Sequence, residues 1–264
     1  MMRRCIRLLI AFDGTAYRGW QRQLHVPTIQ ATLEEALGRI CGHAITLHGA
    51  GRTDSGVHAL AMVAHFHTPV QHPLSAFIRG VNSLIPPDIR ILDAHEENID
   101  FHCRYSALGK TYRYDLYAGQ IQLPTRRLYE GHFPGTLNIK IIETCLNVLI
   151  GTHDFSSFEA VGSRDPLQKG RGAVRTITDA RLRENGRQSY SLFFTGDGFL
   201  RHMVRNLVGT LIQAGRGTIS PEQFNKILAS RDRSKAGPTA PARGLFLETI
   251  YYDQKSMPFP VKKQ

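Results

Sequence analysis

Residues 49–66 read GAGRTDSGVHALAMVAHF and join a glycine-rich loop to an apolar, strand-like segment. The three glycines of the loop permit tight turns and close approach of the backbone to a ligand. Asp54 lies among them, two residues from Arg52. A nearby cation lowers the pKa of a carboxyl group, so we expect Asp54 to be ionised and suited to act as a nucleophile or a base. The alternative is structural, with Asp54 closing an Asx-turn and Arg52 solvated.

The first hundred residues contain alternating strand and helix patterns around this loop. Residues 4–12 alternate like a strand, and residues 29–40 have helical spacing after Thr28, a typical helix N-cap. The later elements are expected to be strands at residues 44–47 and 60–67, a helix at residues 74–85 and a strand at residues 89–94. This order, β-α-β-β-α-β, is that of the split βαβ or ferredoxin-like unit.

The second half repeats the same order of elements. It is expected to contain strands at residues 111–117, 176–183, 190–195 and 245–252 and helices at residues 139–150 and 200–214, with an extra helix at residues 221–228 before the last strand. The sequence therefore predicts an α+β fold of two ferredoxin-like, RRM-like βαββαβ units, residues 1–106 with the Asp54 loop and residues 107–264. The two halves share no visible sequence identity. A sheet covered by helices on one side leaves its other face available to a ligand.

The composition points to an anionic partner. The chain has 264 residues, with 33 Lys and Arg against 22 Asp and Glu, and a formal net charge of +11. For such a chain, nucleic acid is the commonest anionic partner. A membrane-surface protein would need a basic amphipathic helix or a lipidation signal, and the sequence shows neither. No segment has the length of a membrane span, and the four cysteines are scattered singly, so we expect a cytoplasmic protein with reduced thiols.

Two glycine-containing basic loops interrupt the second unit, at residues 119–135 and 162–174. Their charged residues include Arg126, Arg127, Arg164, Lys169 and Arg171. In so basic a chain we expect these loops to contact phosphates. The alternative is that they are solvated connections.

Two further segments carry candidate functional side chains. Tyr112 and Tyr114 share one face of a strand, where an aromatic ring beside arginines can stack on a base; for Tyr114 we favour an ordinary core role. Arg205 lies close to the apolar stripe of the helix at residues 200–214. A buried arginine needs a carboxylate partner, for which Asp54 is the candidate. The alternative is that Arg205 extends its guanidinium into water.

Several other classes of site fit the sequence poorly. The loop lacks the third glycine of a dinucleotide fingerprint, which argues against a nucleotide cofactor of the Rossmann type. Asp54-Ser55-Gly56 matches the Asp-Ser/Thr-Gly of aspartic proteases, which need two such loops; a dimer could supply the second. His65 and His67 share a strand face, but no third ligand follows at the usual spacing, so we expect no metal.

Five segments together resemble the TruA family of tRNA pseudouridine synthases. They read GRTDSGVHA, GKTYRY, HDFSSF, FLRHMVRNLVG and AGPTAPARGLFL, in the family's order and over most of the chain. The resemblance implies an enzyme that isomerises uridine to pseudouridine at positions 38, 39 and 40 of the tRNA anticodon arm, after base flipping. It also implies a homodimer that needs no cofactor and no metal. The family's two ferredoxin-like halves form one mixed or antiparallel sheet with a central basic cleft.

The resemblance also assigns roles to individual residues. It implies that Asp54 is the nucleophile, Arg52 helps to extrude and replace the target base, Tyr112 stacks on the flipped uracil, Arg205 pairs with the catalytic carboxylate and Leu245 lines the uracil pocket. The departures are small: Ser55 stands where many members have Ala, and Arg201 occupies a variable position. The basic loop at residues 162–172 also differs from the family pattern, which bears on the range of substrates.

Three alternatives remain beside this hypothesis. The first is a non-catalytic RNA-binding protein, and the second is a uridine isomerase that acts on another RNA. The third, a retaining hydrolase of N-glycosides, would need a second carboxylate about 5 Å from Asp54, which the five segments do not offer. The sequence leaves open the preferred uridine and tRNA, the dimer interface, the order of the basic loops without RNA, and whether the nucleophile attacks C1′ or C6 or assists elimination to a glycal.

Overall fold

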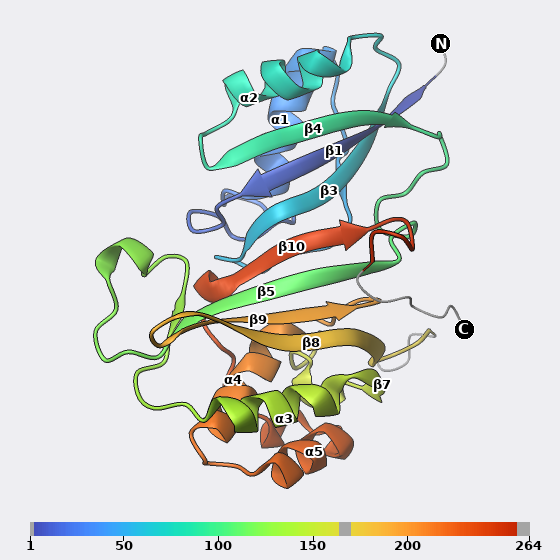
Figure 1. The fold of residues 1–264 in the computed structure, drawn as a ribbon. Coiled ribbons are helices and arrows are strands. Elements are labelled where there is room, and N and C mark those ends of the chain that lie inside the picture. Colours follow the sequence, from blue (N-terminus) through green and yellow to red (C-terminus); the bar gives the residue numbers. More distant parts are fainter. Residues whose placement is uncertain (1–2, 164–169, 258–264) are drawn as a thin grey trace. The chain divides into compact units, whose positions relative to one another are not determined.

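In the computed structural model, which describes residues 3–163 and 170–257, the chain divides into two units (Figure 1). The first comprises Met1–Leu108 with Phe246–Tyr252, and the second Gly109–Leu245 with Asp253–Gln264. Each unit contains its own strands and helices, so the predicted α+β class is confirmed.

The sheet of the first unit has the strand order β4-β1-β3-β10. Its strands are β1 (Arg4–Phe12), β3 (His58–Thr68), β4 (Ile89–Glu97) and β10 (Leu245–Tyr251), and the two-residue β2 (His48–Gly49) also pairs with β3. β1 pairs antiparallel with β3 and β4, whereas β10 runs parallel to β3. Ile6, Leu8 and Ile10 are fully buried on one face of β1, because their alternation matches the two-residue period of a strand.

Helix α1 (Ile29–Cys41) begins and ends where its local sequence predicts. The hydroxyl of Thr28 accepts a hydrogen bond from the amide of Ala31, and Gly42 closes the helix in the left-handed region with φ +70°. The helix predicted at residues 74–85 instead forms a π-helical turn (Ala76–Gly80) followed by the short helix α2 (Val81–Leu84).

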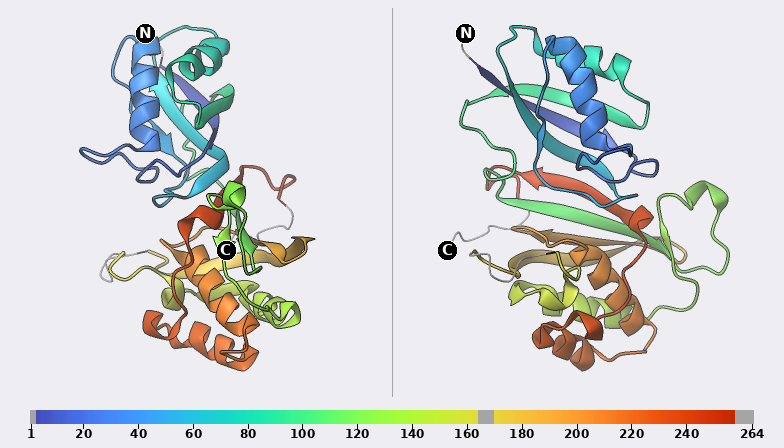
Figure 2. Two further views of the ribbon diagram at one scale, coloured as in Figure 1. Left: turned by 90° about the vertical axis from the view of Figure 1, so that its left-hand side faces the viewer. Right: turned by 180° about the vertical axis from the view of Figure 1, so that it is seen from behind.

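The second unit has a sheet with the order β5-β9-β8-β7. The strands are β5 (Gly109–Tyr117), β7 (Gly151–Asp154), β8 (Val174–Gly186) and β9 (Ser189–Gly196), all antiparallel, and the two-residue β6 (Gly131–His132) runs parallel to β5. The helices are α3 (Ile139–Leu149), α4 (Met203–Gly215) and α5 (Pro221–Ser230). α3 packs against β8 and α4, and α5 packs against α3 (Figure 2).

Short helical turns connect these elements. They are η2 (Pro124–Arg126), η3 (Ser156–Phe158), η4 (Arg233–Lys235) and η5 (Ala242–Gly244). α4 is the most buried helix of the second unit, with its apolar stripe of Met203, Leu207 and Leu211 fully buried. This helix carries Arg205 and starts directly after the segment FLRH.

The structure differs from the sequence-based expectations at three strands. The short strand expected at residues 44–47 forms later, as β2. Residues 151–154, which give no alternating pattern, form β7 against β8. The strand expected to end the second unit, β10, pairs with β3, and its residues Phe246–Tyr251 belong to the first unit. Strand partners depend on tertiary packing, which the local pattern of residues 245–252 does not encode.

Within the described ranges, no helix is long and apolar enough to cross a membrane. No group of three or more His, Cys, Asp or Glu side chains in the same ranges is arranged to hold a metal ion. All four cysteines are buried and unbridged.

Candidate active site

The loop that carries Asp54 is held by the backbone of a second loop, residues 13–20. The amide of Trp20 donates to the carbonyl of Thr53 over 3.1 Å, and the amide of Gly56 donates to the carbonyl of Tyr17 over 3.4 Å. The hydroxyl of Ser55 donates to the same Tyr17 carbonyl. These contacts flank Asp54 on both sides, so they hold the backbone around it in position.

Two glycines allow these loops to approach so closely. A Cβ at Gly19, which has φ +90°, would lie 2.5 Å from the carbonyl oxygen of Thr53. A Cβ at Gly49 would lie 2.5 Å from the buried ring of Trp20. Glycine is therefore required at both positions for steric reasons.

The bracing loop is itself anchored to the rest of the first unit. The amide of Gly14 donates to Nδ1 of the buried His58 over 3.1 Å, at the start of β3. The hydroxyl of Tyr17 donates to Asp88 over 2.7 Å. Burial, together with this hydrogen bond, raises the pKa of Tyr17 above its usual range, so the phenol stays protonated. Sequence reasoning missed this loop; the Gly19-Trp20 pair is the signal that could have marked it.

Asp54 is half-buried and Arg52 is exposed. The carbonyl of Asp54 accepts a hydrogen bond from the amide of Val57, which closes the turn before β3. Within the described residues, Arg52 makes no hydrogen bond or ion pair, with Asp54 or with any other side chain. The cation expected beside Asp54 therefore extends into solvent, where it is available to a ligand.

Tyr112 and Tyr114 lie on the same face of β5, as expected. Tyr114 is fully buried, and its hydroxyl donates to the carbonyl of Pro241 over 2.9 Å, which agrees with a core role. Tyr112 is 9% exposed and packs edge-on against Phe199, with the ring centroids 5.0 Å apart. This packing limits rotation of the Tyr112 ring.

Arg205 binds the segment that precedes β10. Its Nε donates to the carbonyl of Ala240 over 2.8 Å, and the amide of Ala240 donates back to the carbonyl of Arg205 over 3.1 Å. One turn further along α4, a Cβ at Gly209 would lie 1.7 Å from the carbonyl oxygen of Pro238. Leu245, at the end of this segment, is buried. The motif PTAPARG is thus fastened to α4 in the second unit.

Asp54 belongs to the first unit, whereas Tyr112, Arg205 and Leu245 belong to the second. Their assembly into one site, with an ion pair between Asp54 and Arg205, stays a prediction. Within the second unit, the structure joins α4, which carries Arg205, to the segment that ends at Leu245.

The arginines of the basic loops are partly engaged. Arg126 forms an ion pair with the buried Glu130. Arg127 donates to the carbonyl of Pro124, and Arg171 pairs with Asp197 over 2.7 Å. Arg164 and Lys169 lie outside the described residues.

Comparison with known proteins assigns the chain to a class. The sequence model of the family described as tRNA pseudouridine synthase matches residues 8–106 and 146–253, which is most of the chain. A curated relative from Desulfotalea psychrophila, named tRNA pseudouridine synthase A 1, is 50% identical over 250 residues, covering 94% of this chain and 100% of the relative. The protein is therefore an isomerase of the RNA-modifying class. It belongs to the tRNA pseudouridine synthase family.

Other relatives agree with this assignment. Proteins named tRNA pseudouridine synthase A from Syntrophotalea carbinolica and Acetivibrio thermocellus are 41% and 42% identical, and each aligns with 94% of this chain and at least 96% of the relative. Among solved structures, a chain from "Crystal Structure of a Cbf5-Nop10-Gar1 Complex" aligns at a TM-score of 0.32 and 10% identity. It covers 78% of this chain and 54% of that chain, a likeness too weak to support an argument.

Proposed function

We propose that this enzyme isomerises uridines 38, 39 and 40 of the tRNA anticodon stem-loop, with Asp54 as the nucleophile on a flipped-out base. The observation that carries the proposal is the bracing of the Asp54 loop. Hydrogen bonds from residues 17–20 hold Thr53 and Gly56 through their backbones and Ser55 through its hydroxyl, and Asp54 between them is half-buried. A nucleophile held in position on a rigid support lowers the entropic cost of reaching the transition state.

The reaction is an isomerisation whose atoms balance without a co-reactant. The C1′–N1 bond of uridine breaks, the uracil turns, and a bond forms between C1′ and C5. The hydrogen on C5 leaves as a proton, and N1 ends protonated. No electron donor or energy source takes part, so we propose an enzyme without a cofactor. The base must first leave the stack, which costs a few kcal/mol.

Four other residues are proposed to support Asp54. Arg52, exposed and unengaged by other described residues, would occupy the gap left by the base. The packed ring of Tyr112 would stack on the uracil, and Leu245 would line its pocket. Arg205 would neutralise the Asp54 carboxylate, since a guanidinium is a permanent cation with five N–H donors, one of which is bonded to Ala240.

The proposal extends to the fold and the assembly. Each unit is proposed to be ferredoxin-like, the two forming one sheet with a central basic cleft, in a cytoplasmic homodimer. Arg126, Arg127 and Arg171, with Arg164 and Lys169, are proposed to contact tRNA phosphates. For Arg126 and Arg171 this contact would compete with their carboxylate partners, Glu130 and Asp197.

The test uses unmodified tRNA transcripts that carry tritium at C5 of uridine. Wild-type protein is expected to release tritium to water, and Asp54→Asn to release none while it binds tRNA as tightly. Carbodiimide-stop sequencing then maps the product, with stops expected at positions 38–40. Stops elsewhere would show that the enzyme acts on another site or RNA. Release by Asp54→Asn at the wild-type rate would remove Asp54 from the chemistry.

A further inference from the structure

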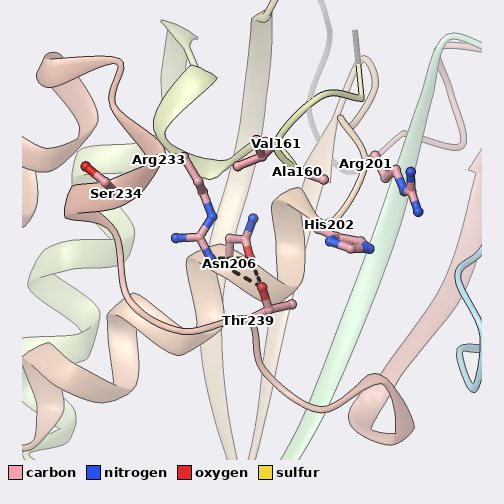
Figure 3. Close-up of a pocket in the computed structure, with 8 residues that line it drawn as sticks. All are labelled: Ala160, Val161, Arg201, His202, Asn206, Arg233, Ser234 and Thr239. Atoms are coloured by element: carbon pink, nitrogen blue, oxygen red, sulfur yellow. Dashed lines mark hydrogen bonds between the residues drawn. The ribbon is translucent and has the colours of Figure 1, made fainter.

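The second unit contains an open pocket that none of the roles above uses. It encloses about 470 Å³ and is lined by Ala160, Val161, Arg201, His202, Asn206, Arg233, Ser234 and Thr239. Figure 3 shows Arg233, Asn206 and Thr239 bonded to one another, with Arg201 and His202 on the other side of the pocket. Two of the lining residues carry guanidinium groups and one carries an imidazole.

Hydrogen bonds join three separate segments to form this pocket. The amide of Ala160 donates to the carbonyl of Arg201 over 2.9 Å. The side-chain amide of the fully buried Asn206 donates to the carbonyl of Phe158 over 2.8 Å, and its oxygen accepts from the hydroxyl of Thr239 over 2.6 Å. These are the segments that follow HDFSSF, begin α4 and precede β10. Because these hydrogen bonds hold the three segments together, the pocket is a fixed part of the folded unit.

The pocket holds positive charge without a matching carboxylate. Arg233 donates to four neutral oxygen atoms, which belong to Ala236, Gly237, Asn206 and Thr239. Within the described residues, the side chain of Arg201 is exposed and makes no hydrogen bond or ion pair. None of the eight lining residues is acidic.

The two neighbouring carboxylates, which are not among the lining residues, accept hydrogen bonds from serines. Asp232 accepts from the amide and hydroxyl of Ser234, and Glu159 accepts from the hydroxyl of Ser163. Partial burial lowers the pKa of Arg233, because it removes water from a cation whose hydrogen bonds go to neutral oxygens. An unpaired, partly desolvated cation is costly, and an anionic ligand would offset that cost.

The backbone at the pocket adds to this positive potential. α4 is 13 residues long and begins at the pocket, with His202 as its N-cap residue. His202 has φ +61°, an uncommon conformation for a residue other than glycine, and its side chain does not cap the helix. The amides at a helix start attract anions. The His202 side chain instead lines the pocket on the same side as Arg201 (Figure 3).

We propose that this pocket binds a backbone phosphate of the tRNA, outside the nucleotide that is isomerised. This inference rests on the proposed tRNA substrate. The apolar wall of Ala160 and the exposed Val161 suits a ribose next to the bound phosphate. The exposed Arg201 would pair with the phosphate from the solvent side. Arg233 and the amides at the start of α4, which are held in place by the fold, would bind it from the inner side.

The test compares Arg201→Gln with Arg187→Gln. Arg187 is an exposed arginine at the turn between β8 and β9, without a partner in the described residues, so the second variant makes the same charge change away from the pocket. Arg201→Gln is expected to weaken tRNA binding about fivefold near 0.1 M salt and to reduce the slope of log K against log salt by about 0.7 to 0.9. Arg201→Lys is expected to restore the slope. Equal affinities and slopes for the two Gln variants would overturn the proposal.

Phosphate-ethylation interference locates the contact on the RNA. We expect ethylation of one particular tRNA phosphate to weaken binding by the wild-type protein but not by Arg201→Gln. The same interference pattern for both proteins would also overturn the proposal. Free AMP and pyrophosphate form the second arm. Arg201-dependent binding of either at micromolar concentration, with unchanged tRNA interference, would assign the pocket to a small phosphate instead of RNA.

Tritium release keeps this inference separate from the proposed function. Arg201→Gln is expected to retain the wild-type kcat at saturating tRNA and to raise KM. Tritium release that requires Asp54 tests the chemistry, whereas the salt slope and the ethylation pattern test the pocket. Either result can fail while the other stands.

Discussion

Replacement of Gly19 by alanine tests whether the loop at residues 13–20 positions Asp54. The new Cβ would lie 2.5 Å from the carbonyl oxygen of Thr53 and 3.0 Å from the carbonyl carbon of Asp54. Contacts under 3.0 Å are essentially never seen for a real Cβ, so the backbone beside Asp54 must move by about half an ångström or more. The φ of +90° adds backbone strain of about 1–2 kcal/mol for alanine.

Gly42→Ala is the matched control. Gly42 also has positive φ, +70°, at the end of α1, but nothing lies within 4 Å of its added Cβ. This variant therefore carries the backbone strain, about 1 kcal/mol, without displacing any neighbour. The comparison separates strain from displacement of the Asp54 loop.

The assay combines urea unfolding with tritium release at saturating tRNA. We expect Gly42→Ala to lose about 1 kcal/mol of stability and to keep the wild-type kcat. We expect Gly19→Ala to lose at least as much stability and about tenfold in kcat, since a displacement of 1 Å can cost about a hundredfold. A folded Gly19→Ala enzyme with the same kcat as Gly42→Ala would refute the idea that this contact positions Asp54.

Two further predictions concern packing and pH. Gly209→Ala should improve helix propensity by about 1 kcal/mol, but its Cβ would meet the carbonyl of Pro238 at 1.7 Å, so we expect a net loss of about 1–3 kcal/mol in urea unfolding; a stabilised variant would contradict this. Burial, with smaller contributions from neighbouring histidines such as His102, lowers the pKa of His65 from 6.5 to about 4. The neutral form is thus favoured in the folded state, and stability should fall as the pH drops from about 6.5 to 4. His65→Phe should flatten this dependence in urea unfolding at pH 7, 5.5 and 4.5, and an unchanged slope would exclude His65 as its source.

The sequence predicts those elements whose signals are local. β1 and α1 form where expected because strand alternation, the Thr28 cap and Gly42 all act within a few residues. The pairing of β10 with β3 was not foreseen, because it joins segments far apart in the chain. The π-helical turn before α2 was missed for a similar reason. Gly80, at its end, packs so closely on Ile40 that an added Cβ would lie 2.9 Å from that side chain.

The candidate site likewise has features that the local sequence predicts and features that depend on distant contacts. The residue types of the Asp54 loop mark it as unusual, but the bracing from Tyr17 and Trp20 uses backbone atoms that any residue could supply. In the sequence, only the glycines that let the two loops approach each other indicate this contact. The ion pair of Arg126 with Glu130 was within reach, since the two residues are four apart, but the buried position of Glu130 required the structure.

The net charge overstates how many arginines are available to bind RNA, because ion pairs within the protein already engage several of them. Several arginines already have carboxylate partners, among them Arg4 with Glu96, Arg22 with Glu34, Arg126 with Glu130 and Arg171 with Asp197. An arginine that leaves a carboxylate to reach a phosphate exchanges one ion pair for another, and gains less than an arginine that was solvated. Arg52 and Arg201 have no such partner among the described residues. Contact of Arg201 with a phosphate would therefore add a full ion pair, and Arg201 should contribute more to the affinity for tRNA than Arg126 or Arg171, which must each leave a carboxylate.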